Sequence, residues 1–216
     1  MRYKAVLFDM DGTVLDTLSD LTDAVNHTLR LFNMPERTKA ECASMLGNGA
    51  AYLISHAVPE GTPEDRVKEV LEVYMPYYDS HCRIKTAPFD GIVALMQKLR
   101  AQGGRLAVIS NKQDSAVKPL AQSYFPGLLE IAVGESATVR RKPNPDAVLS
   151  ALRQLGVERE DAVYVGDTEV DVATARNAGL DVAAVTWGFR THAQVAATGA
   201  ENVFDTVEEL EKFLLG

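Results

Sequence analysis

The stretch Ala5-Val6-Leu7-Phe8-Asp9-Met10-Asp11-Gly12-Thr13 decides the fold of this chain. Its first four residues are apolar without alternation, which is typical of a strand buried on both faces of a parallel sheet. Two acids follow at once, and the glycine after them allows a sharp turn because it carries no Cβ penalty at positive φ. The stretch therefore predicts a buried strand that delivers carboxylates to its carboxyl end.

Other short apolar runs repeat this pattern further along the chain. Helical patterns lie between most of them, and strands that alternate with helices predict a Rossmann-like parallel sheet in an α/β fold. The expected strands cover residues 5–8, 106–109, 131–133, 162–165 and 182–185, and the expected helices beside them cover 91–100, 115–123, 146–155, 170–178 and 206–214.

The segment from Leu15 to Lys85 interrupts this alternation, because it contains no convincing strand. Turn-forming residues divide it into helical patterns over 18–32, 39–46, 50–57 and 64–81. Thr17 and Asp20 fit a capping box at the start of the first of these helices. We therefore expect an α/β core of residues 1–14 and 86–216, with a helical cap of residues 15–85 inserted after the first strand.

Composition and charge limit the classes of function. The 216 residues are 46% hydrophobic, which is ample for a buried core. A net charge of -8 without a long basic stripe argues against nucleic-acid binding. No stretch is long enough to span a bilayer, and the first apolar run is too short for a signal sequence. We expect a cytoplasmic protein, a monomer or weak homodimer, with neither nucleic acid nor membrane as a partner.

Residues able to do chemistry follow several of the expected strands. Ser110 and Asn111 follow the second, Lys142 lies in a polar loop after the third, and Asp167 and Asp171 come after the fourth. Open parallel sheets place their sites at the carboxyl ends of strands, so these residues should converge. A carboxylate can attack phosphorus, carboxylates can hold Mg²⁺, and a lysine adds positive charge beside a phosphate. The set indicates metal-assisted phosphoryl transfer.

The spacing of Asp9 and Asp11 fits such a reaction. Residues two apart in a strand point the same way, and a turn at the strand end can separate them. One acid then faces the metal, while Asp11 is free to protonate the leaving oxygen and later to deprotonate water.

These segments resemble, in order, the four motifs of haloacid-dehalogenase-superfamily phosphatases. The first motif is Phe8 to Thr17, the second is Ser110-Asn111, the third is Lys142 in Lys-Pro-Asn-Pro, and the fourth is Gly166-Asp167 with Asp171. The resemblance covers essentially the whole chain. It implies a phosphatase with a Rossmann-like core, in which a small helical cap closes over the site.

The resemblance also implies residue roles. Asp9 is the nucleophile, Asp11 is the general acid and base, and Lys142 completes the catalytic set. Mg²⁺ is held by Asp9, the main-chain carbonyl of Asp11 and Asp167, and Asp171 supports the metal site. Lys142 also binds the phosphoryl group. The other residues expected at the substrate are Gly12, Thr13, Ser110, Asn111, Gly47 and Asn48.

Particular positions narrow the choice within the superfamily. Asp11 argues against the dehalogenases, which lack this acid, and Leu21 stands where hexose-phosphate mutases carry a cap histidine. The segments 46–50, 88–92 and 187–188 resemble phosphoglycolate phosphatases, although pyrophosphatases and sugar phosphatases share such segments. We expect a Mg²⁺-dependent phosphomonoester hydrolase that forms an aspartyl-phosphate and acts on a small phosphorylated metabolite. The alternatives are a pyrophosphatase, sugar phosphatase or phosphomutase of the same superfamily.

Other interpretations stay open at this point. Asp171 also fits a first-turn acid favoured by the helix dipole, and Gly47-Asn48-Gly49 also fits a plain turn between helices. A phosphoacceptor signalling domain likewise pairs a parallel sheet with acids, a hydroxyl and a lysine. It would keep its phosphate for minutes or longer, whereas a helical insertion directly after the acid pair favours substrate capture.

Overall fold

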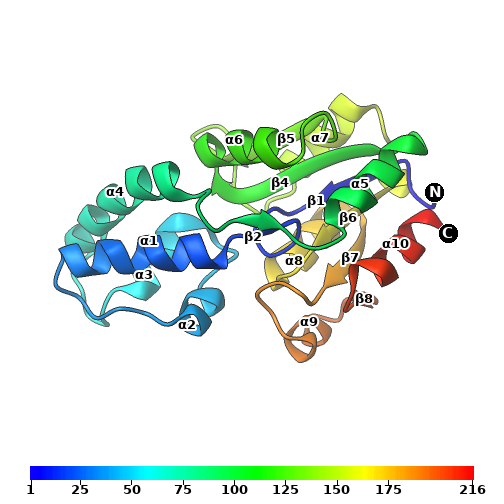
Figure 1. The fold of residues 1–216 in the computed structure, drawn as a ribbon. Coiled ribbons are helices and arrows are strands. Elements are labelled where there is room, and N and C mark those ends of the chain that lie inside the picture. Colours follow the sequence, from blue (N-terminus) through cyan, green and yellow to red (C-terminus); the bar gives the residue numbers. More distant parts are fainter.

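A six-stranded parallel sheet forms the centre of the protein in the computed structural model, which describes residues 1–216. The strand order is β5-β4-β1-β6-β7-β8, and helices cover both faces (Figure 1). This confirms the predicted α/β, Rossmann-like fold class. The strands are β1 (Ala5–Phe8), β4 (Arg105–Gln113), β5 (Ile131–Glu135), β6 (Ala162–Gly166), β7 (Asp181–Val185) and β8 (Asn202–Phe204).

The side chains of β1 alternate between two apolar cores. Val6 and Phe8 join the larger cluster on one face, and Ala5 and Leu7 join the smaller cluster on the other. Because both faces are buried, an uninterrupted apolar strand is the stable choice here. The larger cluster is covered by α5 (Ile92–Ala101), α6 (Asp114–Tyr124) and α10 (Val207–Leu215), and the smaller by α7 (Asp146–Leu155) and α8 (Glu169–Ala178).

Four helices occupy the segment between β1 and the rest of the sheet, and they gather at one end of the molecule (Figure 1). α1 and α4 pack against each other, α3 packs on α4, and α3 also contacts β4. A short antiparallel pair, β2 (Leu15–Asp16) and β3 (Ala87–Pro88), joins the two ends of this segment. The helices are α1 (Leu18–Leu31), α2 (Lys39–Ser44), α3 (Gly49–Ala57) and α4 (Glu64–His81).

The predicted capping box at the start of α1 is wrong. The side chain of Thr17 makes no cap hydrogen bond, and its Oγ1 is buried without a partner. Asp20 is also buried, and its carboxylate accepts from the backbone N–H groups of Ile84 (3.0 Å), Lys85 (2.9 Å) and Thr86 (2.9 Å) and from the Thr86 hydroxyl (2.9 Å). The carboxylate thus ties α1 to the segment that returns to the sheet.

Four other features differ from the sequence-based expectation. The two-residue strand β2 lies in the segment that was expected to contain no strand. β4 does not end at Ile109 but continues to Gln113, with its pairing to β5 interrupted between these residues. The edge strand β8 and the short helix α9 (His192–Ala197) were not predicted. β8 has three residues, all half-buried, and therefore lacks the apolar run by which the other strands were found.

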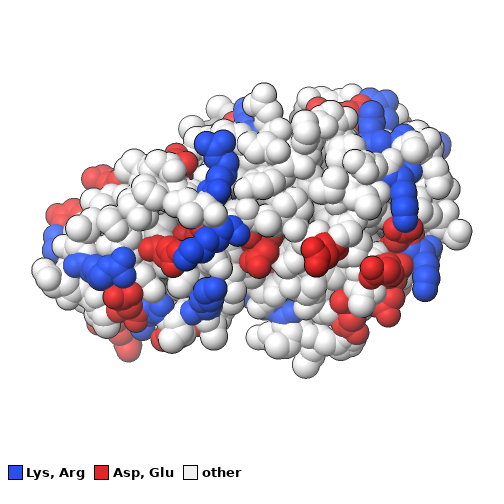
Figure 2. All heavy atoms as spheres, viewed as in Figure 1, with Lys and Arg blue, Asp and Glu red and all other residues white.

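The surface carries both signs of charge. On the face shown in Figure 2, acidic and basic side chains are interspersed and no continuous basic stripe runs across it. None of the helices combines the length and the apolar character that crossing a membrane requires.

We predict that Asp20→Ala lowers the free energy of unfolding by about 2–4 kcal/mol, because the N–H groups of residues 84–86 lose a charged acceptor. Urea denaturation measures this loss. Asp23→Ala is the matched control, since Asp23 lies one turn further along α1 and pairs with Lys85 at an exposed position. Equal losses in the two variants would contradict the role assigned to Asp20.

Candidate active site

Three buried carboxylates meet at the carboxyl edge of the sheet. Asp9 directly follows β1, Asp167 directly follows β6, and Asp171 lies in the first turn of α8. One oxygen of each lies within 4.8 Å of the others. The meeting follows from topology, because β1 and β6 are parallel neighbours whose carboxyl ends coincide. These residues form the acid cluster of the site.

Lys142 lies among these acids. Its Nζ is 2.8 Å from Oδ1 of Asp9 and 2.7 Å from Oδ1 of Asp171, and it donates to the hydroxyl of Tyr164 at 3.1 Å. Burial alone would lower the pKa of Lys142, but the carboxylates of Asp171 and Asp9 outweigh this and hold the pKa well above its usual range. The lysine therefore stays charged.

One cation does not balance three buried carboxylates. Burial, opposed by the charge of Lys142, raises the pKa of Asp9 from 3.8 to about 7, and the charge of Asp171 adds to the rise. Burial and the charges of Asp171 and Asp9 raise the pKa of Asp167 well above its usual range. The acid cluster therefore carries unfavourable negative charge when its members are ionised.

A divalent cation fits this cluster. The contact of Lys142 with Oδ1 of Asp9 lacks the geometry of a hydrogen bond, and this buried oxygen has no hydrogen-bond partner. A hard cation prefers oxygen ligands and would relieve both the excess charge and the unpartnered oxygen. Oδ2 of Asp171 accepts from Thr168 N (3.0 Å) and from Thr168 Oγ1 (2.7 Å). Asp171 is therefore also the first-turn acid of α8 that the sequence allowed.

Gly12 and Thr13 lie against Asp167. Thr13 Oγ1 donates to Oδ1 of Asp167 at 2.9 Å, and Phe189 N donates to Oδ2 at 2.7 Å. A Cβ on Gly12 would stand 2.4 Å from Oδ2 of Asp167, and one on Gly188 would stand 2.3 Å from the same atom. Both glycines thus allow the backbone to approach the carboxylate. Gly12 and Thr13, expected at the substrate, do not line the main pocket of the site, which lies on the other side of Asp9 and Asp11 toward the helical segment.

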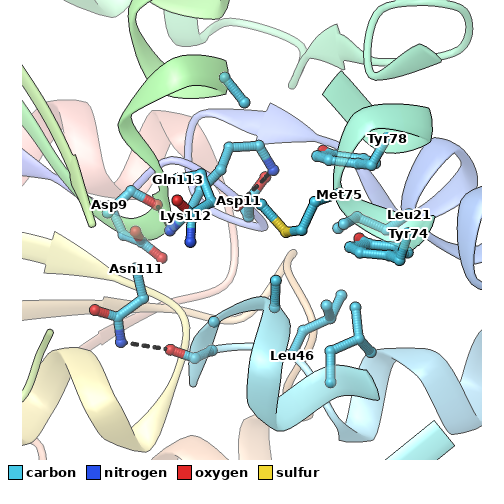
Figure 3. Close-up of a pocket in the computed structure, with 16 residues that line it drawn as sticks. Asp9, Asp11, Leu21, Leu46, Tyr74, Met75, Tyr78, Asn111, Lys112 and Gln113 are labelled. Carbon is cyan, nitrogen blue, oxygen red and sulfur yellow. Dashed lines mark hydrogen bonds and ion pairs between the residues drawn. The ribbon is translucent and has the colours of Figure 1, made fainter. Parts of the chain in front are cut away.

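The pocket lies between the sheet edge and the helices α1, α3 and α4 (Figure 3). Acids and polar groups come from the sheet side, and apolar and aromatic side chains come from the helical side. Of the residues predicted from the sequence, Asp9, Asp11, Ser110, Asn111 and Gly47 line this pocket, whereas Asn48 lines a separate open hollow beside Arg141.

Asn111 connects the lysine loop with the segment between α2 and α3. Its Nδ2 donates to the carbonyls of Gly47 (2.9 Å) and Lys142 (3.1 Å), and its Oδ1 accepts from the backbone N–H of Lys142 (2.7 Å). Ser110, which is also buried, accepts from the backbone N–H of Lys112 (3.2 Å). Asn111 therefore positions the loop that carries the buried lysine.

Sequence reasoning missed Lys112. Its Nζ donates to both side-chain oxygens of Asp11, at 2.7 and 2.9 Å, and lies 4.6 Å from the ring centre of Tyr78. The Asp11 side chain is therefore not part of the acid cluster. The signal that could have found Lys112 is its place directly after Ser110-Asn111, at the end of a strand that points to the site.

Arg190 was missed as well. Its guanidinium pairs with both oxygens of Glu169 at 2.8 and 2.9 Å, and it donates to the carbonyls of Ala43 and Leu46 at 2.9 Å each. No sequence signal could have found this contact, because it joins the loop after β7 to the segment after α2.

The comparisons with known proteins agree with this geometry. Residues 6–185 match the model of the haloacid dehalogenase-like hydrolases. The chain belongs to the haloacid dehalogenase-like hydrolase family. It is a phosphatase-type enzyme of this family, similar to its phosphoglycolate phosphatases, so the resemblance inferred from the four motifs is confirmed.

Individual relatives in this hydrolase family are similar over nearly the whole chain. Phosphoglycolate phosphatase 1 of Pseudomonas aeruginosa is 32% identical, covering 96% of this chain and 78% of the relative. The N-acetylmuramic acid 6-phosphate phosphatase of the same organism is 29% identical, covering 97% and 94%. A crystal structure of a Lactobacillus delbrueckii subsp. bulgaricus protein superposes with a TM-score of 0.95 and 40% identity over 100% of both chains.

We predict that Lys142→Met lowers the free energy of unfolding of the metal-free protein by about 3–5 kcal/mol, because it leaves buried carboxylates without their cation. Chemical denaturation at neutral pH in the presence of a chelator measures this change. Lys118→Met, at an exposed position on α6, is the matched control and should change stability little. A Lys142→Met protein as stable as the control would show that the acids are not charged together.

Proposed function

We propose that this enzyme is a Mg²⁺-dependent phosphomonoester hydrolase that passes through an aspartyl-phosphate on Asp9. The observation that carries the proposal is the placement of Asp9, which lines the pocket and lies 2.8 Å from the charged Nζ of Lys142. A nucleophile needs a free lone pair and a nearby positive charge that tolerates an incoming phosphate.

In the proposed first step, Asp9 attacks phosphorus and the bond from phosphorus to the ester oxygen breaks. Asp11 donates its proton to the leaving oxygen, which departs as an alcohol. In the second step, Asp11 accepts a proton from water while the water oxygen attacks phosphorus. The bond between phosphorus and Asp9 then breaks, and inorganic phosphate leaves.

The remaining residues balance the charge at Asp9 and hold the phosphoryl group in place. Lys142 keeps its ammonium group beside Asp9 throughout, and Ser110 binds the phosphoryl oxygens. Asn111, whose amide is engaged by Gly47 and Lys142, holds the lysine loop beside them. Mg²⁺, held by Asp9, the main-chain carbonyl of Asp11 and Asp167 with support from Asp171, supplies positive charge that reduces repulsion between carboxylate and phosphate. Asp167 is held ready for this role by Thr13 and Phe189.

Residues 15–85 act in this proposal as a cap that closes over the pocket and excludes water. Its contacts with the core support this. Asn111 donates to the carbonyl of Gly47, Arg141 donates to that of Asn48 at 3.0 Å, and Arg190 donates to that of Leu46. Three core side chains thus hold one short backbone segment of the cap.

The substrate we propose is a small phosphorylated metabolite, with 2-phosphoglycolate first. Relatives with two different substrates in their names are almost equally identical to this chain, so sequence identity does not decide between the two substrates. The helical side of the pocket is lined mainly by apolar and aromatic residues such as Leu21, Leu53 and Tyr74. A sugar would leave many hydroxyls there without partners, which favours a short substrate.

The direct test is phosphate release from a panel of monoesters, including 2-phosphoglycolate and sugar phosphates, with and without Mg²⁺. We expect Mg²⁺-dependent release from the wild type and a loss of at least about 1,000-fold in Asp9→Asn, because nucleophilic attack is removed. Asp23→Asn is the exposed control. Full activity in Asp9→Asn would refute the aspartyl-phosphate, and isomerised sugar phosphate without free phosphate would favour a mutase.

The lifetime of the phosphoenzyme tests the non-enzymatic alternative. We expect it to be hydrolysed on the timescale of turnover, and persistence for minutes would favour a signalling domain.

The stabilisation by Mg²⁺ should depend on pH. The pKa of Asp9 is about 7 in the folded protein against 3.8 ordinarily, so its contribution to the stability of the metal-free protein is lost as pH rises toward 7. Because metal ligands must be deprotonated, Mg²⁺ restores more stability at high pH. We expect the increase in Tm on adding Mg²⁺ to be larger at pH 8 than at pH 5.5.

Asp167→Asn should abolish this Mg²⁺ effect at both pH values, while Asp161→Asn, at an exposed ion pair with Lys4, should retain it. An increase in Tm that does not depend on pH would contradict the assignment of the acid cluster as the metal site.

A further inference from the structure

The pocket contains a cation that the reaction proposed above does not use. Lys112 is the only cationic side chain among the residues that line the pocket, and its side chain is only 4% exposed. It reaches the pocket from β4, and its Nζ lies next to Asp11 and 4.6 Å from the ring centre of Tyr78 on α4 (Figure 3). It lies on the polar, sheet side of the pocket, where Asp11 balances its charge.

A second observation points to a ligand at the same place. The hydroxyl of Tyr78 is buried and has no hydrogen-bond partner, although this residue lines the pocket. Buried hydroxyls in folded proteins are nearly always hydrogen-bonded, so a buried hydroxyl without a partner beside a cation needs an explanation. An oxygen of a bound molecule would supply the missing acceptor.

We propose that Lys112 and Tyr78 form a subsite for a carboxylate of the substrate, close to its ester oxygen. The proposal rests on the proposed function and deepens it, because it assigns the substrate class to particular residues. The ammonium and the hydroxyl both donate hydrogen bonds, and a carboxylate accepts them from several directions.

The position of Lys112 sets the distance between the two ends of the substrate. Its Nζ lies within 2.7 and 2.9 Å of the oxygens of Asp11, the residue proposed to protonate the leaving oxygen. A carboxylate that contacts Lys112 must therefore lie near that leaving oxygen. In 2-phosphoglycolate one carbon separates the ester oxygen from the carboxylate, whereas longer substrates would carry an anionic group past Lys112.

Binding at this subsite also frees Asp11. In the structure both oxygens of Asp11 accept from Lys112, so neither is free to present a proton to the leaving group. A lysine has three N–H donors, and a substrate carboxylate that takes up one or two of them releases an oxygen of Asp11. The correct substrate thus contributes to placing the acid.

The test compares two ligands that differ in the carboxylate, 2-phosphoglycolate and ethyl phosphate. Lys112→Gln should lower the ratio of kcat/KM for 2-phosphoglycolate to that for ethyl phosphate by about 10- to 100-fold, the range expected for losing a charge-assisted hydrogen bond. Lys118→Gln on the surface of α6 is the matched control and should leave the ratio unchanged. Lys112→Arg, which keeps the charge, should restore part of it.

Tyr78→Phe is an independent variant, because it removes one oxygen and keeps the ring. We expect the same ratio to fall by about 5- to 10-fold, in KM more than in kcat, as for one neutral hydrogen bond. Tyr77→Phe, one residue away and stacked between His27 and His81, is its control. This variant decides the question if Lys112→Gln does not fold.

Calorimetric binding of both ligands to Mg²⁺-loaded Asp9→Asn, with and without Lys112→Gln and Tyr78→Phe, separates this proposal from the proposed function. A wild type that does not hydrolyse 2-phosphoglycolate overturns the substrate assignment, while a selective loss of its binding in the variants still supports the subsite. Equal losses for the two ligands, or no loss for either, overturn the subsite and assign Lys112 to charge balance with Asp11 alone.

Discussion

Three carboxylates that meet beside one buried lysine are the constraint on which the rest of the site depends. Burial and mutual repulsion raise the pKa of Asp9 and Asp167; the charge of Lys142 offsets part of the rise at Asp9, and hydrogen bonds from Phe189 and Thr13 offset part of it at Asp167. If the cluster served only to stabilise the fold, replacing it with apolar residues would make the protein more stable. Its cost is consistent with a functional origin, and the surrounding backbone is shaped to it, since Gly12 and Gly188 leave no room for a Cβ beside Asp167.

The parallel sheet produces this crowding, and that is why much of it could be predicted. Asp9 and Asp167 each follow an apolar run, and neighbouring parallel strands end at the same edge. Local sequence is therefore sufficient to place Asp9, Asp167 and Lys142 near one another, and the fold class follows from the same alternation. Their chemical roles come from the family resemblance rather than from the pattern.

The residues that sequence reasoning missed share a physical property, because their partners lie far away along the chain. Lys112 pairs with Asp11 across 101 positions, and Asp20 binds the segment 84–86 across more than 60. The place of Lys112 after Ser110-Asn111 puts it near the site, but nothing local identifies Asp11 as its partner. Asp20 even satisfies a local rule, the capping box, and the structure overrides it because buried N–H groups elsewhere need the acceptor.

Asn111 links the loop of the buried lysine to the helical segment of residues 15–85. One side chain accepts from the backbone of Lys142 and donates to the carbonyl of Gly47, so the position of the buried lysine and the seating of the loop between α2 and α3 depend on the same group. A displacement of that loop would break one of these hydrogen bonds and loosen the other. The helical segment and the loop of the buried lysine are therefore connected through this one amide group.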